Sequence, residues 1–125
     1  MNERIITREY LKKNPNEIFV FGDNYHRRGT GGAAILRDEP NVYGFITKKT
    51  PGSNSEDYFT LEEYHTVFER ELNKLIEEIL RNPDKTYLIS RIGAGIANRH
   101  GIFEGIIDPQ IKKALKKYKN VKFLW

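Results

Sequence analysis

Two glycine-rich segments contain the residues whose types and spacing could bind an anion. Residues 28–34 include three glycines and residues 91–97 include two, and each segment follows an apolar run. Glycine lets backbone N–H groups approach an anion closely, and a helix that follows the loop adds the positive end of its dipole. A single glycine loop is most often a plain turn. Two of them in one short chain predict a clamp for the phosphates of a nucleotide-like ligand.

Polar residues beside the loops could contact the sugar or the phosphates of this ligand. Asp23 and Asn24 end the apolar run at 18–21 and are interpreted either as ribose or base contacts or as turn residues. Lys48 and Lys49 end a second apolar run, where they are either phosphate or ribose contacts or solvated charges.

Arginines and histidines also adjoin the loops. Arg27, Arg28 and Arg91 could pair with a diphosphate, and Arg91 is the first choice because it directly follows a strand pattern. His26 and His100 each adjoin an arginine and are interpreted as surface histidines. Because the three histidines of the chain have no Asp or Glu at ligand spacing, we expect no metal site.

The elements that must position these residues alternate between strand and helix. Apolar runs predict strands at residues 18–21, 42–47, 86–90 and 121–125. Helical patterns predict helices at residues 33–37, at 60–81 and from 108 onward. Residues 5–11 form either a short strand or a helical turn.

This alternation predicts an α/β fold, namely a three-layer α/β/α domain with a mostly parallel sheet. Residues 1–125 then form one domain, with residues 1–16 as an N-terminal extension. Because the carboxyl ends of parallel strands share one edge of the sheet, both glycine loops are expected at the edge where α/β proteins bind ligands.

Two helices have recognisable start signals. Thr60 and Glu63 predict a capping box, and Asp108 with Pro109 predicts an N-cap followed by a first-turn proline. The apolar stripe expected on the long helix comprises Leu61, Tyr64, Phe68, Leu72, Leu75 and Ile79. The core-facing residues expected on the last helix are Ile111, Ala114, Leu115 and Tyr118.

The chain is moderately basic, with a formal net charge of +4 and a pI near 9.3. Much of the excess charge lies in or just beyond the last helix, in Lys112, Lys113, Lys116, Lys117, Lys119 and Lys122. These lysines form either a solvated helix face or a surface for nucleic acid or another acidic partner. No aromatic residues are interleaved on that face of the predicted helix.

Composition also excludes several classes of protein. The chain has no cysteine, which excludes disulfides, thiolate catalysis and cysteine-ligated zinc. No apolar stretch approaches the roughly 20 residues that span a bilayer, and no signal-peptide pattern is present. We therefore expect a cytoplasmic protein without a membrane partner, and no motif indicates a cofactor.

Three motifs in order resemble macro domains, over roughly residues 18–125. Residues 46–49 and 90–96 resemble the C-terminal half of these domains, in particular the branch that removes terminal ADP-ribose from proteins. Residues 28–34 are similar to the first ligand loop of that branch. Residues 19–24 and 38–41 also resemble a compact group of phage and bacterial macro-like proteins.

The resemblance implies an α/β/α fold that holds the diphosphate of ADP-ribose, or of a related nucleotide, between the two glycine loops. With the polar residues beside the loops, the expected ligand-binding residues are Asn24, Arg28, Gly29, Thr30, Gly31, Gly32, Ala33, Arg91, Ile92, Gly93, Ala94, Gly95, Ile96 and Asn98.

The resemblance also implies candidate catalytic residues. Lys48 lies where the branch has a lysine that attacks the anomeric carbon of the distal ribose, a reaction open to an amine. Ala97 replaces the acidic residue of the branch, and loss of such a proton-transfer group typically costs about 10² to 10⁴-fold in rate. Asp23 or Glu104 could substitute for it, and Asp23 could instead activate a water molecule.

Two classes of function follow from the sequence. In the first, the chain binds ADP-ribose or a related nucleotide, free or attached to a macromolecule. This site either hydrolyses an ADP-ribosyl linkage through Lys48 or only binds, as a reader or a sponge for a nucleotide signal. In the alternative, the chain is a nucleic-acid-binding module that uses the basic last helix and the arginine-rich loops.

Overall fold

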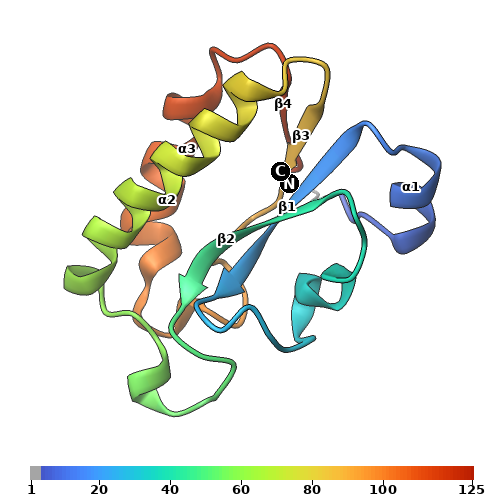
Figure 1. Cartoon of the computed structure of the whole chain (residues 1–125). Helices are drawn as coiled ribbons and strands as arrows, with labels where there is room; N and C mark the ends of the chain where they lie inside the picture. The colour runs from blue at the N-terminus through green and yellow to red at the C-terminus, as the bar shows by residue number, and fades with distance from the viewer. Residues whose placement is uncertain (1–3) are drawn as a thin grey trace.

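Four parallel strands form the middle layer of the protein, which is described here from a computed structural model over residues 4–125. The strands are β1 (Glu17–Asn24), β2 (Val42–Lys48), β3 (Thr86–Ile89) and β4 (Val121–Phe123). They lie in the order β2-β1-β3-β4, and every neighbouring pair is parallel (Figure 1). The predicted α/β fold with a parallel sheet is therefore confirmed.

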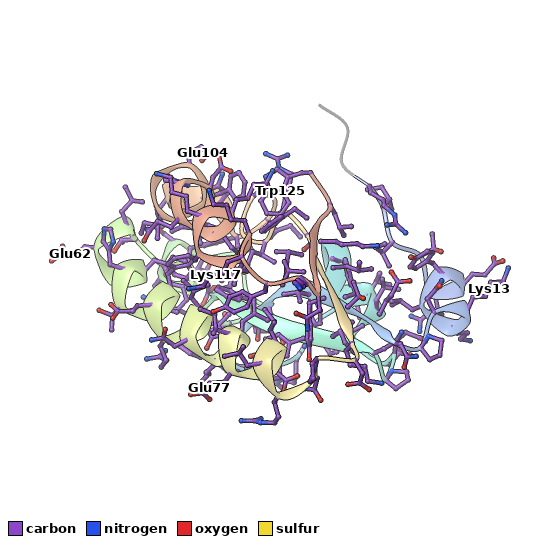
Figure 2. The ribbon with its side chains drawn as sticks, turned by 90° about the horizontal axis from the view of Figure 1, so that it is seen from above. Lys13, Glu62, Glu77, Glu104, Lys117 and Trp125 are labelled. Atoms are coloured by element: carbon purple, nitrogen blue, oxygen red, sulfur yellow. The ribbon has the colours of Figure 1, made fainter. Side chains whose placement is uncertain are left out.

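Helical elements cover both faces of this sheet. The helices α2 (Leu61–Arg81) and α3 (Asp108–Leu115) lie on one face, and α1 (Arg8–Lys13) lies on the other (Figure 1, Figure 2). The 3-10 helix η1 (Gly32–Leu36), which replaces the short helix expected at 33–37, packs on the α1 face. The arrangement is the expected three-layer α/β/α domain.

The apolar run in β1 supplies both halves of the core. Val20 belongs to the cluster beneath α2 and α3, whereas Phe19 and Phe21 belong to the cluster beneath α1 and η1. Successive side chains of a strand point to opposite faces, so a continuous apolar run suits a strand that is covered on both sides.

Residues 4–16 belong to the domain and are not an extension of it. Thr7 caps α1 by accepting a hydrogen bond from the Tyr10 amide at 3.1 Å, and Leu11 is buried in the core. Arg8 fastens this segment to the chain after η1 through ion pairs with Asp38 and Glu39. The Asp38 carboxylate raises the pKa of the Arg8 guanidinium. Residues 1–3 of the predicted extension lie outside the described part of the chain.

Helix α2 has the predicted capping box and an unpredicted polar contact. The Thr60 and Glu63 side chains each accept a hydrogen bond from the other residue's backbone amide. Two further side chains of α2 contact β2. The buried Glu71 carboxylate accepts a hydrogen bond from the Ile46 amide at 2.8 Å, and the Tyr64 hydroxyl donates to the Ile46 carbonyl at 2.6 Å. Both contacts give hydrogen-bond partners to backbone groups on the outer edge of β2, where no further strand of residues 4–125 pairs.

The apolar stripe of α2 differs from the prediction at its first residue. Leu61 is 43% exposed because it lies at the helix end, where its side chain comes close to Gly105. Leu72 is half-buried, and Val67 is a buried residue that the stripe omitted.

The last helix, α3, begins at Asp108 with Pro109 in its first turn, as predicted, but the N-cap role predicted for Asp108 is wrong. Asp108 is not an N-cap, because a π-helical turn, η4 (Phe103–Ile107), runs into α3 without a break. The Asp108 amide donates to the Phe103 carbonyl, five residues back. A wider turn accommodates Pro109, which has no N–H for the regular helical pattern. Ile111 and Leu115 are fully buried, whereas Tyr118 lies beyond the helix end and only partly covers the core.

The connections diverge between β1 and β3. The segment from β1 to β2 crosses the α1 face, whereas the connections through α2 and α3 cross the opposite face (Figure 1). Neighbouring strands whose connections leave in opposite directions form a topological switch point, where open α/β sheets bind ligands. No helix within residues 4–125 is long and apolar enough to cross a membrane.

Candidate functional site

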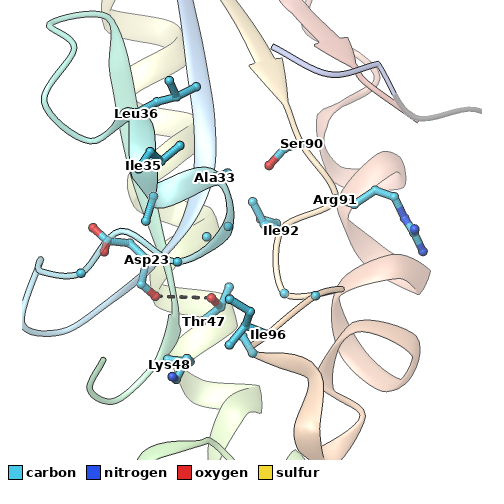
Figure 3. Close-up of a pocket in the computed structure, with 18 of the residues that line it drawn as sticks. Asp23, Ala33, Ile35, Leu36, Thr47, Lys48, Ser90, Arg91, Ile92 and Ile96 are labelled. Carbon is cyan, nitrogen blue, oxygen red and sulfur yellow. Dashed lines mark hydrogen bonds between the residues drawn. The ribbon is translucent and has the colours of Figure 1, made fainter. Parts of the chain in front are cut away.

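A cleft of about 710 Å³ lies at this switch point, and both glycine loops line it (Figure 3). Ala33, Ile35 and Leu36 form one side, whereas Ser90 and Ile92 lie opposite. Most of the ligand-binding and catalytic candidates from the sequence line the cleft, and those that do not are Arg27, Lys49, Asn98 and Glu104. The prediction that the two loops share one edge of the sheet is therefore confirmed.

The loops do not lead into α-helices as expected. The first loop runs into the five-residue 3-10 helix η1, and the second runs into a three-residue 3-10 helix, η3 (Asn98–His100). These short turns carry no substantial helix dipole. An anion in the cleft must therefore be bound by individual N–H groups and by side chains.

Several amides in the loops are available for this purpose. The backbone N–H groups of Gly29, Thr30, Gly31, Gly95 and Ile96 donate to no backbone carbonyl of residues 4–125. All five residues line the cleft. Gly95 in particular faces open space, since a Cβ placed there would meet nothing within 4 Å.

Asp23 anchors the first loop and is not free to act as a base. Its carboxylate pairs with Arg37 at 2.7 Å and with Arg27 at 3.2 Å, and its side chain is only 2% exposed. The Asn24 amide donates to the same carboxylate at 2.8 Å. Gly44 makes room for this group, because a Cβ there would lie 2.5 Å from an Asp23 oxygen. Both oxygens of Asp23 are therefore engaged, and its contacts are those of an ion-paired anchor of the first loop.

Arg37 is the residue that the sequence analysis missed. Its guanidinium donates to the Gly29 carbonyl and to the Arg28 carbonyl, each at 3.1 Å, and lies over the Phe21 ring. It therefore ties the first loop to Asp23 at the end of β1. The one sequence feature that could have indicated Arg37 is its position at the end of the short helix predicted at residues 33–37.

Asn24 also shapes the first loop. Its side-chain amide donates to the Arg28 carbonyl at 2.7 Å, and its side-chain oxygen accepts from the His26 amide at 3.0 Å. These contacts agree with the interpretation of Asn24 as a turn residue.

Apolar contacts position the second loop. Gly93 has a φ of 80°, and a Cβ there would lie 2.5 Å from Cδ1 of the fully buried Ile107. Ile92 is buried beside it. The loop also lies against β1, since a Cβ at Gly22 would be 3.5 Å from the Gly93 nitrogen and 3.0 Å from the Thr47 hydroxyl. The second loop therefore rests on the core beneath η4.

The two loops meet over the cleft at Ile96. This side chain is 58% exposed, and its Cδ1 lies 3.1 Å from the Cβ position of Gly31 and 3.7 Å from that of Gly32. A Cβ at Gly31 would crowd Ile96, whereas one at Gly32 would only touch it, and Gly32 is favoured instead by its φ of 58°. The meeting point explains why small residues occupy the first loop where it faces the second.

Lys48 lies at the lower end of the cleft in Figure 3, and its amine is already engaged. Nζ donates to the Gly52 carbonyl at 2.6 Å and lies 4.5 Å from the centre of the Tyr58 ring. Arg99 covers Tyr58 as well, with its guanidinium carbon 5.4 Å from the ring centre. The carbonyl and the ring face both attract the ammonium charge, whereas a nucleophilic amine must be neutral.

Residues 49–57 form a strap beside this end of the cleft. Lys49 pairs with Glu63 on α2 at 2.9 Å, and Arg99 donates to the Ser53 carbonyl at 3.2 Å. Hydrogen bonds, chiefly from the Thr50 hydroxyl, lower the pKa of the Asp57 carboxyl. The strap is therefore tied at both sides and holds the Lys48 amine in place.

The arginines predicted to pair with a diphosphate point in different directions. Arg91 turns away from the glycine loops, with its guanidinium carbon 4.9 Å from the centre of the Phe103 ring (Figure 3). Arg27 is bound to Asp23 and to the Gly44 carbonyl. Arg28 is exposed, and its contact is with His26 at 3.3 Å. Of these three arginines, Arg28 is the one that lines the cleft and contacts neither Asp23 nor an aromatic ring of the core.

Asn98 and Glu104 face one another outside the cleft. The Asn98 amide donates to both Glu104 oxygens, at 2.8 and 3.0 Å, and its oxygen accepts from the Phe103 amide. Asn98 thus caps the π-helical turn, which corrects its predicted ligand contact. Ala97 is buried and lines the cleft. Within the described residues, neither Asp23 nor Glu104 supplies a free carboxylate.

The histidines and carboxylates are dispersed. In the part of the chain from residue 4 onward, no three His, Cys, Asp or Glu side chains are grouped so that they could hold a metal ion.

Comparison with known proteins assigns the chain to a family. No curated protein and no solved structure matches it. The sequence family DUF7831, described as a family of unknown function, matches residues 1–99, which include both glycine loops and Lys48. The match extends over more than half of the chain, and the protein is therefore a member of the DUF7831 family.

Proposed function

We propose that the cleft binds ADP-ribose or a related nucleotide diphosphate, with the diphosphate between the two glycine loops. The observation that carries this proposal is that residues of both loops line one cleft at the switch point of the sheet, and that five of them have backbone N–H groups that donate to no backbone carbonyl of residues 4–125. Hydrogen bonds to charged groups contribute about 1.5–3 kcal/mol each, so a few such donors provide useful affinity for a diphosphate.

The charge and size of the cleft suit this ligand. Arg4, Arg28 and Lys48 line it, and the Asp23 charge is balanced by two arginines. The volume of about 710 Å³ lies within the range of roughly 300–1,000 Å³ that small-molecule sites occupy. The ligand should therefore be an anion with sugar and base on either side of the phosphates.

The contacts in the cleft favour binding over hydrolysis. Hydrolysis would need a free nucleophile or a free base, whereas the Lys48 amine donates to the Gly52 carbonyl beside the Tyr58 ring and Asp23 is doubly ion-paired. Ala97 supplies no proton-transfer group. We therefore propose a reader or sponge for the nucleotide, and hydrolysis through Lys48 is the variant that the geometry favours less.

Isothermal titration of the purified protein with ADP-ribose, alongside AMP and ATP, tests the proposal. We expect micromolar binding of ADP-ribose, weakened at least tenfold in Gly95→Glu because the new carboxylate enters the space above the loop. Asn73→Glu adds the same charge on the exposed side of α2 and should bind as the parent protein does. Absence of heat with all three nucleotides would overturn the proposal.

A further inference from the structure

Exposed positive charges gather in the last turn of α3 and in the chain that follows it. Lys113, Lys116, Lys117 and Lys119, which we call the lysine face, are all exposed. No Asp or Glu follows Asp108 in the sequence. None of the four lysines forms an ion pair with a carboxylate of residues 4–125.

The fold itself does not require this cluster. Ile111 and Leu115 are fully buried and anchor α3 on the sheet, whereas Lys113 on the same helix is exposed. Helix α3 ends at Leu115, and Lys116, Lys117 and Lys119 follow it in the turn that leads to β4. The core contacts of α3 therefore do not involve these four lysines.

Two other lysines of the same segment are not part of the lysine face. Lys112 donates to the Trp125 carbonyl and lies over the Trp125 and Phe123 rings. Lys122 lies on β4 between Val121 and Phe123, which pack toward α3, and therefore points to the opposite face of the sheet.

The tertiary structure brings aromatic rings beside the basic helix, where the sequence alone indicated none. Phe123 and Trp125 approach each other at 5.7 Å between ring centres, on the same side of the sheet as Lys117 (Figure 2). Their faces are already occupied by Lys112, and Lys117 lies over Tyr118. These rings position the lysines and do not offer open platforms for stacking bases.

We propose that the lysine face binds the phosphate backbone of nucleic acid without reading its sequence. Exposed cations without carboxylate partners suffice for this, because nucleic-acid backbones are bound chiefly through neutralised phosphates. In the arginine-rich loops, Arg27 is already paired with Asp23 and Arg91 lies over Phe103, so the proposal rests on the lysine face alone. The site is separate from the cleft and does not depend on the function proposed for it.

The surroundings of the lysine face favour nucleic acid over other acidic partners. In the described chain, the exposed large apolar side chains are Ile5, Tyr25, Ile35, Leu61, Leu80 and Ile96. None of them lies on α3 or on the chain that follows it. A membrane surface or a docked protein segment normally engages apolar anchors, whereas a phosphate backbone needs only charge.

Fluorescence anisotropy with labelled 20-base-pair DNA duplexes of two unrelated sequences tests this proposal. We expect equal affinity for both duplexes. Affinity should fall about 10²-fold between 50 and 200 mM salt if four phosphates are neutralised. The double substitution Lys113→Glu with Lys117→Glu should weaken binding at 50 mM salt at least tenfold and flatten the salt dependence.

A matched control separates the lysine face from net charge. The double substitution Lys12→Glu with Lys13→Glu makes the same change in charge on exposed residues of α1, and we expect less than a threefold effect. If charge reversal on α3 prevents folding, the neutral pair Lys116→Gln with Lys119→Gln should still lower both affinity and salt dependence.

Three results would overturn the proposal. They are equal weakening by the α3 and α1 variants, salt-independent binding, and binding to phosphatidylserine vesicles in the absence of binding to either duplex.

Discussion

The first glycine loop, residues 28–34, is held by charged and polar side chains, whereas the second, residues 91–97, rests on apolar ones. Arg37 joins the carbonyls of the first loop to Asp23, and this loop is exposed throughout residues 28–33. Gly93 of the second loop packs against Ile107 of the core. One cleft therefore combines two loops with different physical supports.

This difference implies different tolerance to change. A close-packed core responds to the addition of even one methyl group, because there is no space to receive it. Ion pairs with partly exposed arginines are weaker and are screened by salt. We infer that the second loop is the rigid wall of the cleft and that the first can adjust to a ligand.

The largest effect is expected from Gly93→Ala. The substitution places a Cβ at a φ of 80° and 2.5 Å from Ile107 Cδ1, so strain and overpacking combine. We expect a loss of about 2–4 kcal/mol in the free energy of unfolding, measured by urea denaturation. Gly95→Ala, in open space two residues away, should cause no loss. Equal effects of the two substitutions would contradict the proposed role of the core contact.

A smaller loss is expected from Asp23→Asn, which removes the charge that anchors the first loop. The carboxylate is buried, but its partners Arg27 and Arg37 are partly exposed, so solvent compensates for much of the lost attraction. We expect about 1–2 kcal/mol less stability in low salt. The difference from the parent protein should shrink in 1 M salt, and a salt-independent difference would argue against an ionic anchor.

Arg37→Ala tests whether the first loop serves binding more than stability. It frees the carbonyls of Arg28 and Gly29 without opening the core. We expect ADP-ribose affinity to fall about tenfold, or about 1.4 kcal/mol, with less than about 1 kcal/mol change in unfolding. Arg81→Ala, at an exposed pair with Glu78, is the control that should leave titration unchanged. Unaltered affinity in Arg37→Ala would remove the first loop from the site.

The smallest effect concerns Lys48, which lies beside the cleft but is held by the strap. We expect no covalent adduct when the protein is incubated with ADP-ribose and borohydride and then analysed by mass spectrometry. Lys48→Ala should weaken ADP-ribose binding only about threefold, because one partly solvated charge is lost. An adduct in the parent protein that disappears in Lys48→Ala would instead establish the hydrolytic version of the site.

Local patterns in the sequence predicted much of the fold. The apolar runs located the four strands, and Thr60 with Glu63 predicted the start of α2. The local patterns did not predict the π-helical turn before α3, because Asp108 followed by Pro109 matches the pattern of an ordinary helix start. The buried Glu71 was also missed, since its partner is the backbone of Ile46 on another element.

The sequence by itself determined that two glycine loops follow two parallel strands, and hence that they meet at one edge of the sheet. That result depends only on strand direction, which the alternation of helix and strand dictates. Only the tertiary structure decided which polar groups remain free there. Asp23 is paired with Arg37, Asn98 with Glu104, and Arg91 lies over Phe103. Such contacts follow no periodicity, because they depend on where turns bring side chains together in space.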